Sequence, residues 1–462
     1  MFLLFKTLQE EQKLNENRDK ILNPQAPKKL LLINPGNLDK TGLNINTGSS
    51  FPPLGLGVLA ALTPECFQVK LIDENFDTFA YESADLVAIT AFTSVAARAY
   101  EIAKIYEEKG IPVVMGGIHA SMCPDEASRF VSCVVTGEAE SVWPQVVQDF
   151  SKGKLQKRYT AGQCSLTNMP VPKRTLFSDK YLFASVQTSR GCPMDCSFCS
   201  VTTFNGRKYR QRPVKEVLDE LESIKQSYIF FVDDNLLGYG KGASKRAIEL
   251  FKGMVERKLN KKWFCQAAIN FGDDEQVLKW AHKAGCKMVF LGLESPDSDE
   301  LKVMNKKMNV NRIYEKAFKR IHKHKIAIVG AFINGSDAET FQSMKKKTGY
   351  ILKNSIDVIQ TTILTPLPGT RLFNDLVKSN RLLYTRFPED WKNYDMTELT
   401  YRLSKMGSHE FYKAYKKNSE KFYSRFNLAR LFFRTWMATK SIEAANWALS
   451  SNMNYRNVSI NN

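Results

Sequence analysis

Three cysteines in one short run have the type and spacing that could bind an iron–sulfur cluster. Cys192, Cys196 and Cys199 form a C-x3-C-x2-C pattern, and soft thiolate sulfur suits the irons of such clusters. Three thiolates can hold three irons of a 4Fe–4S cluster, which leaves the fourth iron open to a small molecule. Gly191 and Pro193 flank the first cysteine and indicate a sharp loop that could wrap the cluster.

Two other interpretations of these cysteines stay open. A structural zinc site usually takes four ligands, often in C-x2-C pairs. The nearest other cysteines, Cys164 and Cys265, lie far away in the sequence without comparable spacing. Three buried thiols gathered by chance are the remaining alternative, which the glycine and proline around Cys192 disfavour.

Length and composition predict a multidomain globular protein. The 462 residues suffice for roughly three domains, and 43% hydrophobic residues allow sizeable cores. Nine cysteines without a regular framework indicate a reducing, cytoplasmic compartment. The apolar run over residues 1–5 is too short for a signal segment or a membrane span, so we expect residues 1–27 to form a helical extension. No continuous apolar stretch reaches spanning length.

The first part of the chain alternates between apolar strands and helices. Continuous apolar runs of this kind indicate a parallel sheet covered on both faces. The candidate strands are residues 30–34, 69–73, 86–90, 112–117 and 133–137. They predict a flavodoxin-like, doubly wound domain over residues 28–152, which would bind its ligand beyond the carboxyl ends of the strands.

Small and polar residues gather where three of these strands end. Thr93 and Ser94 follow the third strand, Gly116 and Gly117 end the fourth, and Glu138 follows the fifth. Glycines and small hydroxyls let the backbone approach a large flat or phosphate-bearing ligand. Together they predict a ligand site at this edge of the sheet.

A second α/β region follows a proline-containing linker over residues 153–180. Its candidate strands are residues 183–188, 228–232, 263–268, 288–291, 326–333 and 358–364. Six parallel units predict a full or partial α/β barrel over residues 181–370. The cysteine loop follows the first strand, and barrel active sites lie at the carboxyl ends of strands.

The last region, residues 371–462, is expected to be helical, basic and rich in aromatics. Residues 401–440 hold ten Lys or Arg and two Glu, which concentrates part of the overall charge of +18. Aromatic side chains at helical spacing mark one face: Phe411, Tyr415, Phe422, Phe426, Phe433 and Trp436. We expect this face to pack on the barrel. Contact with an anionic lipid surface is the second interpretation, and nucleic acid ranks below it because no RNA-binding module is recognisable.

With these residues in view, the chain resembles the cobalamin-binding radical S-adenosylmethionine (SAM) enzymes. The match covers roughly residues 28–370 and is most specific at the three cysteines. The resemblance implies an α/β fold with an N-terminal flavodoxin-like cobalamin-binding domain, then a partial (β/α)6 radical SAM barrel and a helical C-terminal region. It implies three cofactors: a 4Fe–4S cluster, SAM and cobalamin.

The same resemblance suggests residues that contact SAM. Phe198 precedes the last cysteine, Asp234 and Asn235 follow the second barrel strand, and Glu294 follows the fourth. A carboxylate at a strand end can accept hydrogen bonds from ribose hydroxyls, as expected for Glu294, while Asp234 or Asn235 could hold the SAM ammonium. The alternative for each is a strand-end residue that caps a helix or satisfies loop backbone.

The first domain departs from many cobalamin proteins at one point. The D-x-H-x-x-G signature that donates a histidine to cobalt is absent, and residues 34–39 after the first strand contain no histidine. Cobalamin would therefore bind without histidine ligation there, with Thr93, Ser94, Gly116, Gly117 and Glu138 as the candidate contacts. His119 is the only histidine of this domain, either near the ligand or structural.

The favoured function is a radical SAM methyltransferase acting on an unactivated carbon of a small or lipid-like substrate, similar to hopanoid-methylating members. The alternatives are an oxidative cyclase of the anaerobic tetrapyrrole type, a tRNA methylthiotransferase and a cobalamin-binding sensor. Such an enzyme requires an electron donor such as flavodoxin or ferredoxin. We expect a cytoplasmic protein, with peripheral membrane contact through the basic C-terminal region as a second expectation.

Overall fold

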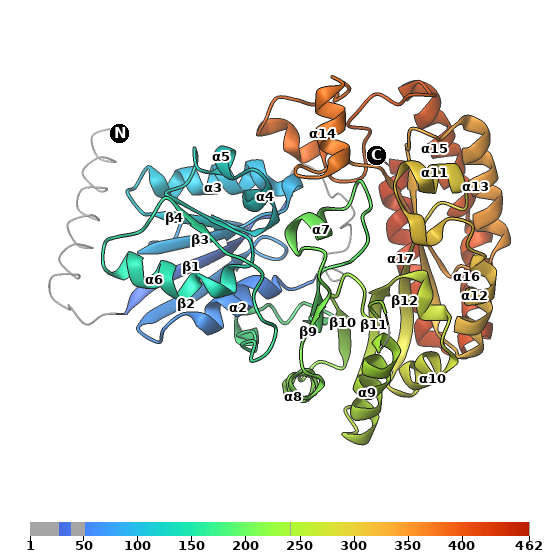
Figure 1. The fold of residues 1–462 in the computed structure, drawn as a ribbon, viewed down its shortest axis with the longest axis horizontal. Helices are drawn as coiled ribbons and strands as arrows, with labels where there is room; N and C mark the ends of the chain where they lie inside the picture. The colour runs from blue at the N-terminus through green and yellow to red at the C-terminus, as the bar shows by residue number, and fades with distance from the viewer. Residues whose placement is uncertain (1–26, 38–50, 241, 462) are drawn as a thin grey trace.

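The computed structural model describes residues 27–37, 51–240 and 242–461. Apart from Pro27, the N-terminal extension expected over residues 1–27 lies outside the described residues. Two six-stranded parallel sheets lie side by side, and helices from the C-terminal part of the chain cover the second sheet (Figure 1).

The first sheet has the strand order β2-β1-β3-β4-β5-β6, and all its pairings are parallel. Its strands are β1 (Lys28–Asn34), β2 (Phe67–Asp73), β3 (Leu86–Thr90), β4 (Val113–Gly116), β5 (Cys133–Thr136) and β6 (Arg158–Thr160). The predicted flavodoxin-like domain is confirmed. Its strand order changes direction at β1, with β2 on one side and β3 to β6 on the other, as in doubly wound sheets. The edge strand β6 falls within the stretch expected as a linker, so this sheet extends beyond residue 152.

Helices cover both faces of the first sheet. On one face lie α3 (Ala96–Glu107), α4 (Gly117–Met122) and α5 (Pro124–Ala127), and on the other lie α2 (Leu54–Leu62) and α6 (Trp143–Ser151) (Figure 1). Side chains of β1 alternate between these layers, with Leu31 and Ile33 in one core and Leu30 and Leu32 in the other. This two-sided burial explains the continuous apolar runs in the sequence.

The second sheet forms the predicted partial barrel. Its six strands lie side by side in the same order as in the sequence, and every pair of neighbours is parallel. The strands are β7 (Ala184–Val186), β10 (Tyr228–Phe231), β11 (Lys262–Ala267), β12 (Cys286–Glu294), β13 (Ala327–Asn334) and β14 (Val358–Ile363). The helices α8 (Val214–Ser223), α9 (Ala243–Glu256), α10 (Glu275–Lys283) and α12 (Tyr314–Lys323) share one core with it. The remaining elements are α7 (Ser200–Phe204), α11 (Ser298–Val303), α13 (Phe341–Lys353) and the hairpin of β8 (Ser189–Arg190) with β9 (Arg210–Gln211).

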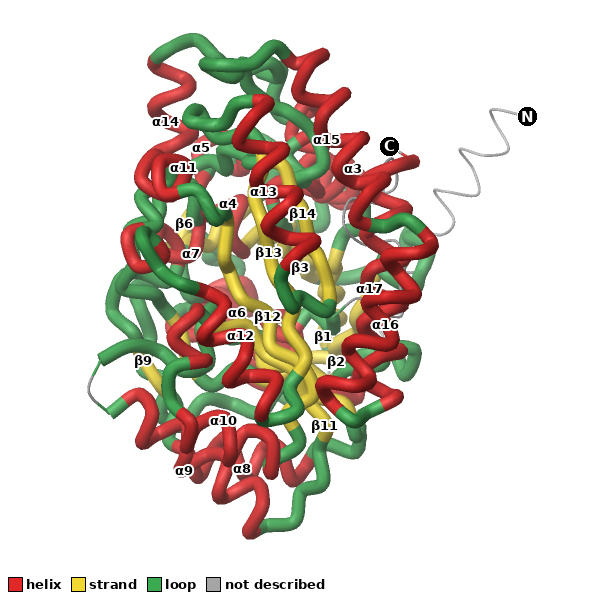
Figure 2. Tube along the Cα trace, turned by 90° about the vertical axis from the view of Figure 1, so that its right-hand side faces the viewer, coloured by secondary structure: helices red, strands yellow, loops and turns green. Residues whose placement is uncertain are grey.

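C-terminal helices close this sheet. They are α14 (Arg371–Lys378), α15 (Ser408–Phe422), α16 (Arg425–Thr439) and α17 (Ile442–Asn461), and Figure 2 shows α16 and α17 alongside the barrel strands. Ala444 and Ala448 of α17 pack on Met288 and Val329, on the sheet face opposite α8–α10. Polar side chains also satisfy the backbone of the edge strand β14. Asn452 accepts a hydrogen bond from the Ile359 N–H at 3.0 Å, and the Tyr423 hydroxyl donates to the Ile359 carbonyl at 2.6 Å. The Tyr415 hydroxyl donates to the Thr361 carbonyl at 3.1 Å.

The aromatic face expected in the C-terminal region is split between two helices. Phe411 and Phe422 of α15 are buried, as predicted. Phe426, Phe433 and Trp436 of α16 are exposed, so the expectation that the whole face packs on the barrel is wrong. Helical spacing identifies a common face but not the environment of that face.

Candidate active site

The cysteine loop joins β8 to α7, and its three cysteines are half-buried and free of disulfides. Two side chains distant in sequence hold its centre, since Asn305 Nδ2 and Arg371 Nη2 donate to the Asp195 carbonyl at 2.5 and 2.6 Å. The Ser197 N–H donates to the Met304 carbonyl at 3.0 Å. Elements on two sides therefore fix the conformation of the loop.

A cavity of about 170 Å³ opens beside this loop. Its lining consists of Pro193, Met194, Asp195, Cys196, Arg207, Asn305, Lys306, Lys307 and Met308. In the part of the chain that the structure describes, no three His, Cys, Asp or Glu side chains converge on one metal-ion position. The three free thiols on this loop could each hold one iron of a cluster.

Gly191 is required by the geometry of the loop. Its φ is +89°, and a Cβ there would lie 2.3 Å from the Lys208 carbonyl oxygen. Gly191→Ala is expected to cost about 1–3 kcal/mol in backbone strain alone, to displace the loop and to lower the iron content after anaerobic reconstitution. The matched control is Gly110→Ala, because Gly110 has a φ of +71° but no atom within 4 Å of its built Cβ. Equal iron contents of the two variants would contradict this account.

Glu294 reaches the cysteine loop through Lys306. Glu294 ends β12 with a φ of +61°, where the pairing with β13 shifts register. Its buried carboxylate accepts a hydrogen bond from Lys306 Nζ at 2.5 Å, and Lys306 lines the cavity beside Cys196. Burial alone would lower the pKa of Lys306, but the Glu294 carboxylate helps to raise it, so the ammonium stays charged. The sequence analysis did not identify Lys306.

Asp234 and Asn235 have different environments. Asp234 is half-buried, and its carboxylate accepts from Asn205 Nδ2 at 3.2 Å. Burial raises the pKa of Asp234 to about 6, against the lowering effect of the Asn205 bond. Asn235 is buried, and its amide accepts from the Ala268 N–H at 3.2 Å and donates to the Gly238 carbonyl at 3.4 Å. The amide of Asn235 thus serves loop backbone, and a SAM contact of either residue stays a prediction.

Phe198 belongs to an apolar cluster beside the cysteine loop. Its half-buried ring packs on a group that includes Leu301, Met304 and Tyr401. These contacts anchor the loop to α11 and to the segment after α14. A contact between Phe198 and SAM stays a prediction.

The loops expected to contact cobalamin lie together, because β3 and β4 are neighbours. Ser94 is half-buried in the turn after β3, and Gly116 and Gly117 join β4 directly to α4. Gly117 has a φ of +89°, and a Cβ there would lie 2.6 Å from Thr90 Oγ1, whereas a Cβ on Gly116 would have ordinary contacts only. Gly117 is therefore required for packing. The cobalamin contacts of Thr93, Ser94, Gly116 and Gly117 stay predictions.

His119 is structural. It is fully buried on α4, with Nε2 at 3.1 Å from the Tyr100 hydroxyl and 3.2 Å from Glu126, and Nδ1 at 3.4 Å from Thr93 Oγ1. Trp391, from the segment after α14, donates from Nε1 to the same Glu126 carboxylate at 2.9 Å. Thr93 is likewise buried. Since His119 is the only histidine of the first domain, this domain offers no exposed imidazole to a cobalt ion.

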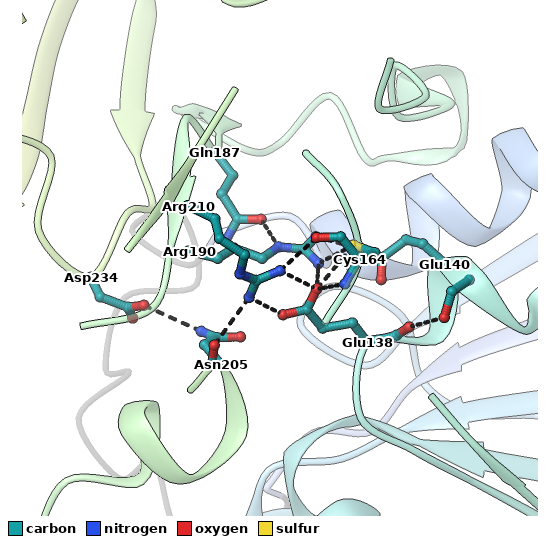
Figure 3. A network of polar contacts seen from close by, with 9 residues as sticks. Glu138, Glu140, Cys164, Gln187, Arg190, Asn205, Arg210 and Asp234 are labelled. Atoms are coloured by element: carbon teal, nitrogen blue, oxygen red, sulfur yellow. Dashed lines mark hydrogen bonds and ion pairs between the residues drawn. The ribbon is translucent and has the colours of Figure 1, made fainter. Parts of the chain in front are cut away.

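Glu138, expected beside cobalamin, is buried between the two domains (Figure 3). Its carboxylate accepts from Arg190 Nη1 at 3.2 Å, from Arg210 Nη1 at 2.8 Å and from the Cys164 N–H at 2.9 Å. Burial alone would raise the pKa of Glu138, but the hydrogen bonds from Arg210 and Cys164 and the charge of Arg190 lower it to about 2. These donors hold the carboxylate in this structure, and a cobalamin contact of Glu138 stays a prediction.

The network around Glu138 continues to Asp234 (Figure 3). Arg210 Nη2 donates to the Asn205 carbonyl at 3.0 Å, and Asn205 Nδ2 donates to Asp234. Arg190 also pairs with Glu140 at 2.5 Å. Sequence reasoning missed the roles of Arg190, Arg210 and Asn205. Of these three residues, only Arg190 could have been noticed in the sequence, because it lies two residues before Cys192.

Comparisons with known proteins agree with this arrangement. Residues 40–147 match the B12 binding domain, and residues 186–346 match the Radical SAM superfamily. The chain is 32% identical to bacteriochlorophyllide d C-12(1)-methyltransferase of Chlorobaculum tepidum, over 86% of this chain and 88% of that one. It is 28% identical to hopanoid C-2 methylase of Rhodopseudomonas palustris, over 72% of this chain and 66% of that one.

A solved structure shares the fold. The cobalamin-dependent S-adenosylmethionine radical enzyme OxsB, with aqua-cobalamin and S-adenosylmethionine bound, superposes with a TM-score of 0.66. The superposition covers 94% of this chain and 73% of that one at 15% identity, which shows a common architecture. The expected cofactors, a 4Fe–4S cluster, SAM and cobalamin, are those of this family. Both domain matches and the full-length relative lead to one conclusion: the chain belongs to the cobalamin-binding radical SAM methyltransferase family.

Proposed function

We propose that this methyltransferase acts on an unactivated carbon of a large, flat, apolar molecule, with a chlorophyllide-type tetrapyrrole as the favoured class. A relative that matches over 86% of the chain is named for bacteriochlorophyllide d, and a less similar one is named for hopanoids, which are lipid-like. One structural observation carries the proposal: a wall of aromatic rings that both domains build.

The aromatic wall consists of Phe51, Phe183, Phe230 and Phe264. Phe51 comes from the first domain, and its ring centroid lies 4.2 Å from that of Phe230. Phe230 stacks on Phe264 at 4.3 Å with an interplanar angle of 14°, and Phe183 meets Phe264 edge-on at 5.0 Å. Phe51 and Phe264 keep exposed surface. Flat rings of this kind favour stacking with another extended ring system.

When bound, the cluster with SAM supplies a radical that abstracts hydrogen from carbon, and cobalamin supplies the methyl group. The chain positions these groups. Cys192, Cys196 and Cys199 would each hold one iron. Glu294, oriented by Lys306, would accept hydrogen bonds from ribose hydroxyls. Asp234 is a better candidate than Asn235 for the SAM ammonium, because Asp234 is half-buried whereas Asn235 is buried and its amide bonds loop backbone.

Glu294→Gln tests the SAM contact. Loss of the charge weakens two interactions at once, the pair with Lys306 and the hydrogen bonds to ribose. We expect the dissociation constant for SAM to rise about tenfold, the effect of ~1.4 kcal/mol, with unchanged iron content. Asp299→Asn is the matched control, because Asp299 lies on α11 in the same segment and has an exposed side chain. The measurement is equilibrium binding of SAM to the reconstituted protein, and an unchanged constant for Glu294→Gln would exclude the contact.

We also propose the cellular setting of the enzyme. All nine cysteines are free, which suits a reducing, cytoplasmic compartment. Among the described helices, none is both long and apolar enough to cross a membrane. An electron donor such as flavodoxin or ferredoxin would reduce the cluster. The basic C-terminal helices would bring the enzyme into peripheral contact with a membrane.

The substrate class can be tested by product mass. Reconstituted protein is incubated anaerobically with SAM and a reductant, with bacteriochlorophyllide d in one reaction and a hopanoid in another. We expect a mass gain of one methyl group in the tetrapyrrole only. Methylation of the hopanoid alone would overturn the substrate class. Formation of 5′-deoxyadenosine with an oxidised, unmethylated tetrapyrrole would favour chemistry of the cyclase type.

A further inference from the structure

Helix α16 has its apolar and polar faces reversed relative to an ordinary surface helix. Such a helix normally buries its apolar stripe and exposes its polar one. The exposed fractions on α16 are 82% for Phe426, 56% for Phe433, 46% for Trp436 and 66% for Met437. The buried residues of the same helix are Asn427, Leu431, Thr435 and Thr439. Spacings of three, four and seven place the exposed apolar side chains on one line.

Hydrogen bonds fix this orientation. The buried hydroxyl of Thr435 donates to the carboxylate of Asp357 at 2.7 Å, and Asn427 Nδ2 donates to the Phe422 carbonyl at 2.5 Å. Arg434 Nη1 donates to the Asn354 carbonyl at 2.9 Å. Rotation of α16 to bury its aromatic side chains would leave these buried polar groups without partners, which is costly. The aromatic line is therefore held at the surface, and Figure 2 shows α16 along the edge of the molecule.

The surroundings of the aromatic line are basic. Helix α16 contains no acidic residue. The seven exposed basic residues on it, beside it and on α15 are Lys413, Lys416, Lys417, Lys421, Arg425, Arg430 and Lys440, and α15 also exposes the acidic Glu410 and Glu420. In the described part of the chain, the ion pairs between basic and acidic side chains include none of these seven residues. The positive charge on and near α16 is thus available to an external anionic surface.

We infer that α16 is a membrane-docking helix, whose aromatic line inserts at the boundary of an anionic lipid surface while the surrounding lysines and arginines contact the headgroups. Phe426 to Met437 spans about 16 Å along the helix axis, which suits a helix lying in the plane of the interface. Tryptophan favours the lipid–water boundary. A second copy of the chain fits less well, because a symmetric contact would bring two such basic faces together. The inference specifies the membrane contact proposed above and does not depend on which molecule is methylated.

The test is co-flotation of the reconstituted holoenzyme with vesicles. One set contains phosphatidylcholine alone and the other contains phosphatidylcholine with phosphatidylglycerol. We expect binding only to the second set, weakened by salt. Replacing Phe426, Phe433 and Trp436 together with serine should lower the partition constant at least about tenfold. The matched control replaces Val171 and Val255 with serine, since both are exposed apolar side chains away from α16. Retained cluster absorbance shows that each variant is folded.

Three outcomes would overturn the inference. The first is no binding of the wild type to either set of vesicles, and the second is equal binding by the triple variant and the wild type. The third is a wild-type dimer in sedimentation analysis that the triple variant loses, without vesicle binding, which would make this face a contact between copies. Formation of 5′-deoxyadenosine is measured separately, so a failure of docking is distinguishable from a failure of the proposed methylation.

Discussion

Cys196→Ala is expected to prevent assembly of the iron–sulfur cluster and to reduce 5′-deoxyadenosine formation to background. Cys196 is the middle cysteine of the loop and lines the cavity with Lys306. With three thiolates for three irons, loss of one thiolate leaves one iron without its protein ligand. The measurement is iron and sulfide content after anaerobic reconstitution, followed by chromatography of the SAM cleavage products.

The control for this prediction is Cys66→Ala. Cys66 is free and exposed and lies outside the loop, so its removal should leave iron content and deoxyadenosine formation unchanged. Full cluster loading and wild-type SAM cleavage in Cys196→Ala would show that the loop does not hold the cluster. Loss of cleavage in both variants would point to a general effect of thiol removal.

Glu138→Ala is expected to have the largest effect on stability. It would leave the guanidinium groups of Arg190 and Arg210 buried between the domains without their shared carboxylate. Removing one partner of a buried ion pair costs about 3–5 kcal/mol. Hydrogen exchange of the backbone around β5, β8 and β9 reports on this interface directly. As a control, Glu82→Ala removes the exposed pair with Lys70 and should cost less than ~1 kcal/mol.

The same carboxylate gives a pH dependence. Its pKa falls from the ordinary value of 4.5 to about 2 in the folded protein. The stabilisation is therefore complete above pH 4.5 and is lost as the pH falls from about 4.5 to about 2. The stability difference between the wild type and Glu138→Gln should shrink over this range. A difference that is constant from pH 7 down to pH 2 would assign the stabilisation to other groups.

Much of the architecture could be predicted because its determinants are local. The apolar runs of β1, β3 and β12 identify buried parallel strands without knowledge of their neighbours. The C-x3-C-x2-C spacing predicts a cluster loop in the same way. The short edge strand β6 was missed, since three residues with one buried side chain carry no periodic signal.

The contacts between distant segments could not be predicted. Glu138 meets Arg190 and Arg210 only because β5 of the first sheet lies against the hairpin of β8 and β9. Lys306 bonds Glu294 at the end of β12, where the pairing with β13 shifts register. Nothing in the local sequence indicates that shift. For α16, periodicity identified the aromatic face, but only packing against the barrel shows that this face points outward.

The most direct test of the central claim follows the methyl group of SAM. The protein is reconstituted anaerobically with iron, sulfide and hydroxocobalamin, then reduced with SAM that carries a deuterated methyl group. A cobalamin-dependent radical SAM methyltransferase should form 5′-deoxyadenosine and transfer the labelled methyl group to the corrinoid that co-elutes with the protein. Deoxyadenosine formation without labelled corrinoid, at full cobalamin loading, would contradict the account and leave a radical SAM enzyme that does not transfer methyl groups through cobalamin.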